Sequence, residues 1–183
     1  ASTRILAFAG SARRASWNKL LARAAARYAE EAGAEVTLLD LAECPMPLYD
    51  GDLEEREGLP EPARAFKRAL AEHHGWLVAC PEYNSSITAL LKNAIDWASR
   101  AEPNEPPLAA FRGKVAGLLA TSPGAGAVRG LRLALLAVAG LSGVASLLLT
   151  PLFALRALLG HGAERLDKRL AVRSSLGAKA TRT

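Results

Sequence analysis

The sequence predicts an α/β protein in which helices cover both faces of a parallel β-sheet. Short apolar segments alternate along the chain with longer segments whose apolar residues recur at helical spacing, without an internal repeat. Loops rich in glycine, serine, proline and asparagine follow the first, third and fourth apolar segments. Ligands of such sheets bind beyond the carboxyl ends of the strands, where the strand order reverses. We therefore expect these three loops to converge on one site.

The apolar segments predict five strands, at Arg4–Ala9, Glu35–Leu39, Trp76–Cys80, Val115–Ala120 and Ser146–Thr150. Helices are expected between and after them at Ser16–Ala32, Ala63–His73 and Ile87–Arg100, near Val128, and more weakly at Ala163–Leu170. The apolar stripe of the first helix is assigned to Trp17, Leu21, Ala24 and Tyr28. We interpret Asp40–Pro62, which is rich in proline, glycine and acidic residues, as a long loop.

Length and composition indicate one domain without a disulfide framework. The 183 residues, half of them hydrophobic, are enough for one full core, and we assign this domain to residues 1–172. Cys44 and Cys80 have neither disulfide nor metal-site spacing, which favours a reducing, cytoplasmic location. The first residues lead directly into a strand pattern, so no signal peptide is expected.

The formal net charge of +5 comes from the C-terminal part of the sequence. Basic and acidic residues balance up to Leu155, and the basic excess lies beyond it. Because no aromatic residues interleave these charges, we interpret residues 173–183 as a flexible basic tail and not as a nucleic-acid arm. The uncharged segment Leu133–Leu155 is interrupted by glycines and Pro151, which favours a buried helix, turn and strand over a membrane span.

The first of the three loops, Gly10–Asn18, has the composition of a phosphate-binding segment. A helix N-terminus presents unpaired N–H groups and partial positive charge. The loop adds neutral and cationic donors, which are Ser11, Ser16, Asn18 and either Arg13 or Arg14. The sequence has neither a Walker A motif nor GxGxxG, so a mononucleotide is favoured over a dinucleotide held by Asp40. The alternative is that Ser16 only caps the helix and both arginines are solvated.

The second and third loops have features that suit a flat ring. In Pro81–Asn84, a rigid proline precedes backbone amides that can bond the edge of a planar heterocycle. In the third loop, Gly124 and Gly126 allow the backbone to approach such a ring closely. The alternatives are a capping turn before the next helix and an ordinary tight turn.

Together these loops resemble the NAD(P)H-dependent FMN reductases of flavodoxin-like fold, which include quinone, chromate and azo-dye reductases. The family pattern GSxRxxSxN is matched by residues 10–18, and PEYNxSxxxxLKNAIDWxSR is matched by Pro81–Arg100 without a gap. A third pattern, Ser-Pro-Gly, is matched at Ser122. The resemblance covers Arg4–Arg132 and implies a flavodoxin-like three-layer sandwich with a five-stranded parallel sheet.

The resemblance also implies cofactors and roles. FMN is the implied cofactor, with its phosphate at Ser11, Arg13, Ser16 and Asn18. Its isoalloxazine ring is expected between Pro81, Glu82, Tyr83 and Asn84 on one side and Ser122, Pro123 and Gly124 on the other. NADPH or NADH would pass hydride to FMN, and an acceptor (flavin, quinone, azo compound or metal oxyanion) would then take the electrons, in a ping-pong cycle. This cycle requires neither a metal nor a catalytic side chain, and relatives imply a homodimer or homotetramer through the Leu91–Trp97 helix.

Two other functions are compatible with these residues. The first is a flavodoxin-like electron carrier that binds FMN without oxidising a nicotinamide. The basic charge balance argues against it, because such carriers dock on basic partners with an acidic face. The second is an interaction protein that does not bind flavin at all, which a colourless purified protein would favour.

Overall fold

The computed structural model describes residues 2–122, 129, 132, 134 and 145–148. These residues contain a parallel sheet with the strand order β2–β1–β3–β6–β7. Its members are β1 (Arg4–Ala9), β2 (Glu35–Asp40), β3 (Gly75–Ala79), β6 (Val115–Leu119) and β7 (Ala145–Leu148). This is the order of flavodoxin-like sheets, which reverses at the β1–β3 boundary. The predicted α/β class with a parallel sheet is confirmed.

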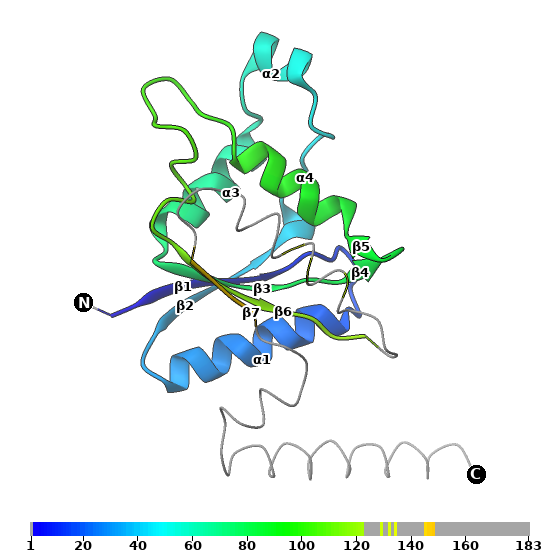
Figure 1. Ribbon diagram of the computed structural model, residues 1–183, viewed down its shortest axis with the longest axis vertical. Coiled ribbons are helices and arrows are strands. Elements are labelled where there is room, and N and C mark those ends of the chain that lie inside the picture. Colours follow the sequence, from blue (N-terminus) through cyan, green and yellow to red (C-terminus); the bar gives the residue numbers. More distant parts are fainter. Residues whose placement is uncertain (1, 123–128, 130–131, 133, 135–144, 149–183) are drawn as a thin grey trace. The chain divides into compact units, whose positions relative to one another are not determined.

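Helices cover both faces of the sheet, as Figure 1 shows. Helix α1 (Trp17–Glu31) lies on one face, and α3 (Glu61–Glu72) and α4 (Ala89–Ala98) lie on the other. Successive strand residues point to opposite faces, so each face has its own core. The face under α3 and α4 is covered by large buried side chains, among them Leu6, Phe8, Phe66, Trp76, Leu91 and Phe111. The α1 face has a smaller core of Ala9, Ala22 and Ala79.

The apolar stripe predicted for α1 is correct only in part. Leu21 packs against the buried cluster, but the buried residues of the helix are Asn18, Ala22 and Ala26, and Trp17 is 70% exposed. Alanines on the sheet and on the helix bring the two backbones close together, and large side chains are displaced to the flanks of the contact. The helix begins where the sequence predicts, because Ser16 is its N-cap and accepts a hydrogen bond from the Lys19 amide.

The segment Asp40–Pro62 is more ordered than the predicted loop. It contains a 3₁₀ turn, η1 (Leu41–Glu43), and a short helix, α2 (Gly51–Glu57). Side-chain hydrogen bonds attach it to α4: Asn93 accepts from the Tyr49 amide at 2.8 Å, and Trp97 donates to the Pro47 carbonyl at 2.8 Å. These contacts join residues more than forty positions apart in sequence, so local composition does not reveal them.

The helix predicted at Ile87–Arg100 begins later, because a small hairpin precedes it. The hairpin consists of β4 (Glu82–Tyr83) and β5 (Ser86–Ile87), paired antiparallel. Its turn residues, Asn84 and Ser85, have φ angles of 51° and 62°, the left-handed pair that a two-residue hairpin turn requires. Thr88 is the N-cap of α4, and its side chain accepts a hydrogen bond from the Leu91 amide.

Several predictions from the sequence lie outside the described residues. They concern Pro123 and Gly124, the helix at Ala163–Leu170, the domain limit at residue 172 and the tail at residues 173–183. Of the helix predicted near Val128, only Arg129, Arg132 and Ala134 are described, and all three are helical. Within the described part of the chain, every helix is too short or too polar to span a membrane.

Candidate functional site

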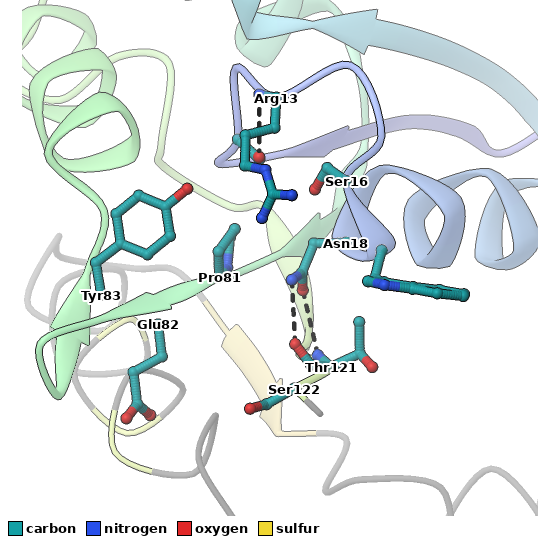
Figure 2. A pocket seen from close by; sticks show the side chains of 10 residues that line it. Arg13, Ser16, Asn18, Pro81, Glu82, Tyr83, Thr121 and Ser122 are labelled. Atoms are coloured by element: carbon teal, nitrogen blue, oxygen red, sulfur yellow. Dashed lines mark hydrogen bonds between the residues drawn. The ribbon is translucent and has the colours of Figure 1, made fainter. Parts of the chain in front are cut away.

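A cavity of about 420 Å³ lies where the chain leaves the carboxyl ends of β1, β3 and β6 (Figure 2). The three loops predicted to converge supply its walls, which include Ser11, Arg13, Ser16, Trp17, Asn18, Pro81, Glu82, Tyr83, Thr121 and Ser122. Cavities of this size are typical of small-molecule sites. The site therefore depends on the order of the strands, since β1, β3 and β6 are neighbours in the sheet.

The first wall carries the groups predicted to bind a phosphate. Ser16 is buried at the N-terminus of α1, where its oxygen accepts from the Lys19 amide and its own hydrogen can be donated to a ligand. The guanidinium of Arg13 points into the middle of the group of side chains in Figure 2. Both arginines of this loop are exposed, but Arg13 lines the cavity and Arg14 lies outside the lining.

Asn18 has a different environment from the other donors of this wall. The residue is 7% exposed, and its side-chain amide makes two hydrogen bonds to the backbone of Thr121 in the third loop. Nδ2 donates to the Thr121 carbonyl at 3.1 Å, and Oδ1 accepts from the Thr121 amide at 3.2 Å (Figure 2). Asn18 thus connects the first loop to the third.

The opposite wall is formed by the hairpin after β3. Pro81 is buried, and Tyr83 is 49% exposed, with its ring across the cavity from Ser16 in Figure 2. Glu82 also lines the cavity, whereas the described position of Asn84 is in the hairpin turn, outside the lining. Arg129 donates to the hydroxyl of Ser85 at 3.1 Å, which attaches the turn to the helix that follows the third loop.

Close packing between the first loop and α4 holds these two walls at a defined separation. Thr88 donates to the Gly10 carbonyl at 2.7 Å and accepts from the Leu91 amide at 3.2 Å. A Cβ atom on Gly10 would lie 2.8 Å from Cβ of Leu91, closer than carbon atoms can approach without displacement. The glycine is therefore required by the neighbouring helix and not by the turn itself.

Two residues of the lining were not predicted from the sequence. Trp17 was placed on a helix stripe, although an aromatic residue between two predicted phosphate donors could have suggested a place at the cavity. Thr121 contributes through its backbone, for which the sequence carries no signal.

Nucleophilic and metal chemistry find little support among the described residues. Burial raises the pKa of the Cys80 thiol to about 12, and burial also raises the pKa of the Cys44 thiol, so neither is a reactive thiolate. No group of histidine, cysteine and carboxylate side chains within this part of the chain could hold a metal ion. The cavity offers binding groups: hydroxyls, a guanidinium, an aromatic ring and backbone amides.

Comparison with known proteins identifies a family. The family model for NADPH-dependent FMN reductase matches residues 3–153. The chain is 38% identical over 125 residues to an NADPH:quinone oxidoreductase of Arabidopsis thaliana, covering 67% of this chain and 60% of that protein. It is 39% identical over 122 residues to a 2-hydroxy-1,4-benzoquinone reductase of a Burkholderia species, covering 67% and 62%. The chain thus spans less than two thirds of the length of these relatives.

A solved structure resembles the fold over a longer span. It is that of a flavoenzyme NAD(P)H:(acceptor) oxidoreductase from Paracoccus denitrificans, with a TM-score of 0.64 and 29% identity. The match covers 82% of this chain and 77% of that chain.

Proposed function

The chain belongs to the NADPH-dependent FMN reductase family, and on that basis we propose that it is an NAD(P)H-dependent flavin oxidoreductase. FMN is the proposed cofactor, NADPH or NADH the electron donor, and a quinone the first class of acceptor to test. The observation that carries the proposal is one cavity with phosphate-binding groups on one wall and a proline–tyrosine hairpin on the other. The names of the relatives support quinones as acceptors.

The residues present fit FMN. A phosphate needs charge-assisted and neutral donors, which Arg13, Ser16 and the N-terminus of α1 supply together. A flavin ring needs a flat surface and polar groups at its edge, which the ring of Tyr83 and the backbone of the hairpin supply. The chemistry that FMN supplies when bound is hydride transfer from the nicotinamide and onward to the acceptor, in a ping-pong cycle.

The chain's own residues have binding and positioning roles in this proposal. Arg13 and Ser16 hold the phosphate, and Ser11 shapes their loop by accepting from the Arg13 amide at 3.4 Å. Backbone N–H groups of the hairpin would hold the edge of the ring and would stabilise negative charge that develops there on reduction. Pro123 and Gly124 remain proposed ring contacts on the strength of the sequence motif.

The remaining features of the proposal concern the whole protein. We propose a homodimer or homotetramer in the cytoplasm, with the described sheet and helices forming part of a complete flavodoxin-like three-layer sandwich. We also propose that residues 1–172 form this domain and that residues 173–183 are a basic tail. The family membership supports the sandwich, and the charge distribution supports the tail.

Visible spectroscopy followed by steady-state kinetics tests the function. The purified protein should bind added FMN and then oxidise NADPH or NADH with a quinone, free FMN or ferricyanide as acceptor. Parallel initial-rate lines at varied donor and acceptor would identify the ping-pong cycle. FMN binding without turnover with any acceptor would instead identify an electron carrier, and a protein that binds no flavin would contradict the proposal altogether.

A further inference from the structure

We propose that Asn18 is a positioning residue that sets the width of the cavity by holding the third loop, and that it does not act as a phosphate ligand. The inference rests on the proposed function in that it concerns the same flavin site. It differs from the role that the GSxRxxSxN motif implies for this asparagine, which groups it with Ser11, Arg13 and Ser16.

The hydrogen bonds of Asn18 carry the inference. Its carboxamide pairs with both backbone groups of one residue, Thr121, in the way that a neighbouring strand would. These two bonds, at 3.1 and 3.2 Å, orient the amide plane and direct both of its polar atoms at the third loop. Asn18 is 7% exposed, so only a small part of the residue faces the cavity that it lines.

The position of Thr121 explains why such a contact is needed. Strand β6 ends at Leu119, so Thr121 lies beyond the last residue that the sheet holds by its ladder of hydrogen bonds. Ser122, the next residue, lines the cavity. Asn18 lies in the first turn of α1, which packs against the sheet through Ala22 and Ala26. A rigid helix therefore holds the start of the third loop at a fixed distance from the first loop.

Thr88 makes the corresponding connection on the other side of the first loop. It is 2% exposed and joins Gly10 to the N-terminus of α4, directly after the hairpin. The first loop is thus attached to the hairpin side through Thr88 and to the third loop through Asn18. Because each contact holds a different wall, loss of the Asn18 contact should alter the ring end of the cavity and leave Arg13 and Ser16 in place.

A comparison of two flavins separates a positioning role from a phosphate contact. FMN and riboflavin share the isoalloxazine ring and differ in the phosphate. Asn18→Ala should weaken binding of both ligands by a similar factor of about ten, which is the effect of losing about two ordinary hydrogen bonds from the preorganised site. Arg13→Ala is the matched control from the same wall, and it should weaken FMN and spare riboflavin. Both affinities are measured by quenching of flavin fluorescence.

The outcomes distinguish this inference from the proposed function. A loss confined to FMN in Asn18→Ala would overturn the inference and restore the phosphate role. Unchanged affinity for both flavins would also overturn it. Failure of the unsubstituted protein to bind either flavin would contradict the proposed function instead, and the positioning role would then rest on the next measurement.

Amide hydrogen exchange provides a readout that needs no flavin. In the flavin-free protein, exchange of the Thr121 amide should accelerate in Asn18→Ala. Exchange of the Leu91 amide, which donates a hydrogen bond to Thr88, should stay unchanged. If Asn18→Ala does not fold, Asn18→Leu keeps the approximate shape of the side chain and removes both hydrogen bonds. An unchanged exchange rate at Thr121 in the folded variant would refute the connection.

Discussion

At the scale of single residues, the structure distinguishes two neighbouring arginines that composition treats alike. Both Arg13 and Arg14 lie in the loop before α1, but only Arg13 is among the described residues of the cavity wall. A guanidinium that faces a phosphate makes charge-assisted hydrogen bonds, whereas a solvated one contributes little. The two residues therefore form a natural pair of test and control.

Arg13→Ala should weaken FMN binding by roughly ten- to a hundredfold, the usual effect of removing a hydrogen bond to a charged group. Arg14→Ala, at the adjacent position, should leave the FMN affinity within about twofold because Arg14 lies outside the lining of the cavity. Fluorescence titration of both purified variants checks the difference. Equal affinities would mean that the first loop does not hold the phosphate through Arg13.

Gly10→Ala should destabilise the protein by about 1–3 kcal/mol, because the new methyl group would press on Leu91 in the packed start of α4. Gly51→Ala is the control, since a Cβ there would meet only the Tyr49 hydroxyl at 4.0 Å. Urea unfolding at neutral pH measures the free energy of unfolding of each variant. A Gly10→Ala protein as stable as the control would show that the first loop and α4 are not tightly packed.

At the scale of elements, a small ionic network attaches the segment after α4 to α3. Lys67 is buried on α3 with its ammonium group between Glu102 and Glu105, and Arg64 contacts Glu102 at 2.6 Å. The hydrogen bond from Lys67 lowers the pKa of the Glu105 carboxyl below its ordinary value. Removing one carboxylate would leave the buried ammonium of Lys67 poorly compensated and would destabilise the fold. This cost is larger than the net stability that the intact ion pair contributes.

The lowered pKa of Glu105 predicts a pH dependence of stability. A carboxyl group with a lowered pKa in the folded state stabilises it above the ordinary pKa of glutamate, about 4.3, and this contribution is lost as the pH falls further. Glu105→Gln should therefore reduce stability at pH 7 by up to about 1 kcal/mol, since the side chain is 35% exposed, and should flatten the decline below pH 5. Thermal unfolding at pH 7 and below pH 5 measures the stability of this variant and of the control Glu72→Gln, at an exposed position. Parallel losses of stability in the two variants would contradict the prediction.

At the scale of the whole molecule, the helix expected to join subunits has most of its apolar residues inside its own protomer. Leu91, Ala94, Ile95 and Trp97 are buried among the described residues, against the sheet and α3. The segment that covers Asn93 and Trp97 instead presents Leu48, which is 78% exposed. Its neighbours Pro47 and Tyr49 are both hydrogen-bonded to α4, so Leu48 is held firmly at the surface.

We expect Leu48 to lie in the subunit interface of the proposed homo-oligomer. Leu48→Glu would place a charge in an apolar contact and should shift the protein toward the monomer. Leu20 is also exposed but lies on α1, and Leu20→Glu should leave the assembly unchanged. Light scattering coupled to size-exclusion chromatography measures the mass of each variant. A wild-type monomer, or an oligomer that Leu48→Glu does not disturb, would contradict the prediction.

The sequence by itself determined the alternation of strands and helices, the α/β class and the three loops at the carboxyl ends of β1, β3 and β6. These features are local, because apolar periodicity, turn residues and helix caps act within a few positions of one another. Ser16 shows this: its place before a helical pattern was sufficient to predict the start of α1. The motif at Pro81–Arg100, which is also local, was sufficient to indicate the family.

Only the tertiary structure decided which face of α1 is buried, that α2 exists, and what Asn18 bonds to. Trp17 has the spacing of an apolar stripe, but the face of α1 that packs against the sheet carries Ala22 and Ala26, and Trp17 is exposed. The side chain of Asn18 could donate a hydrogen bond to a phosphate, but its partner is the backbone of Thr121, 103 residues away. Contacts of this kind depend on the distance between elements, which is set when the sheet and its helices pack and is not encoded in any single segment.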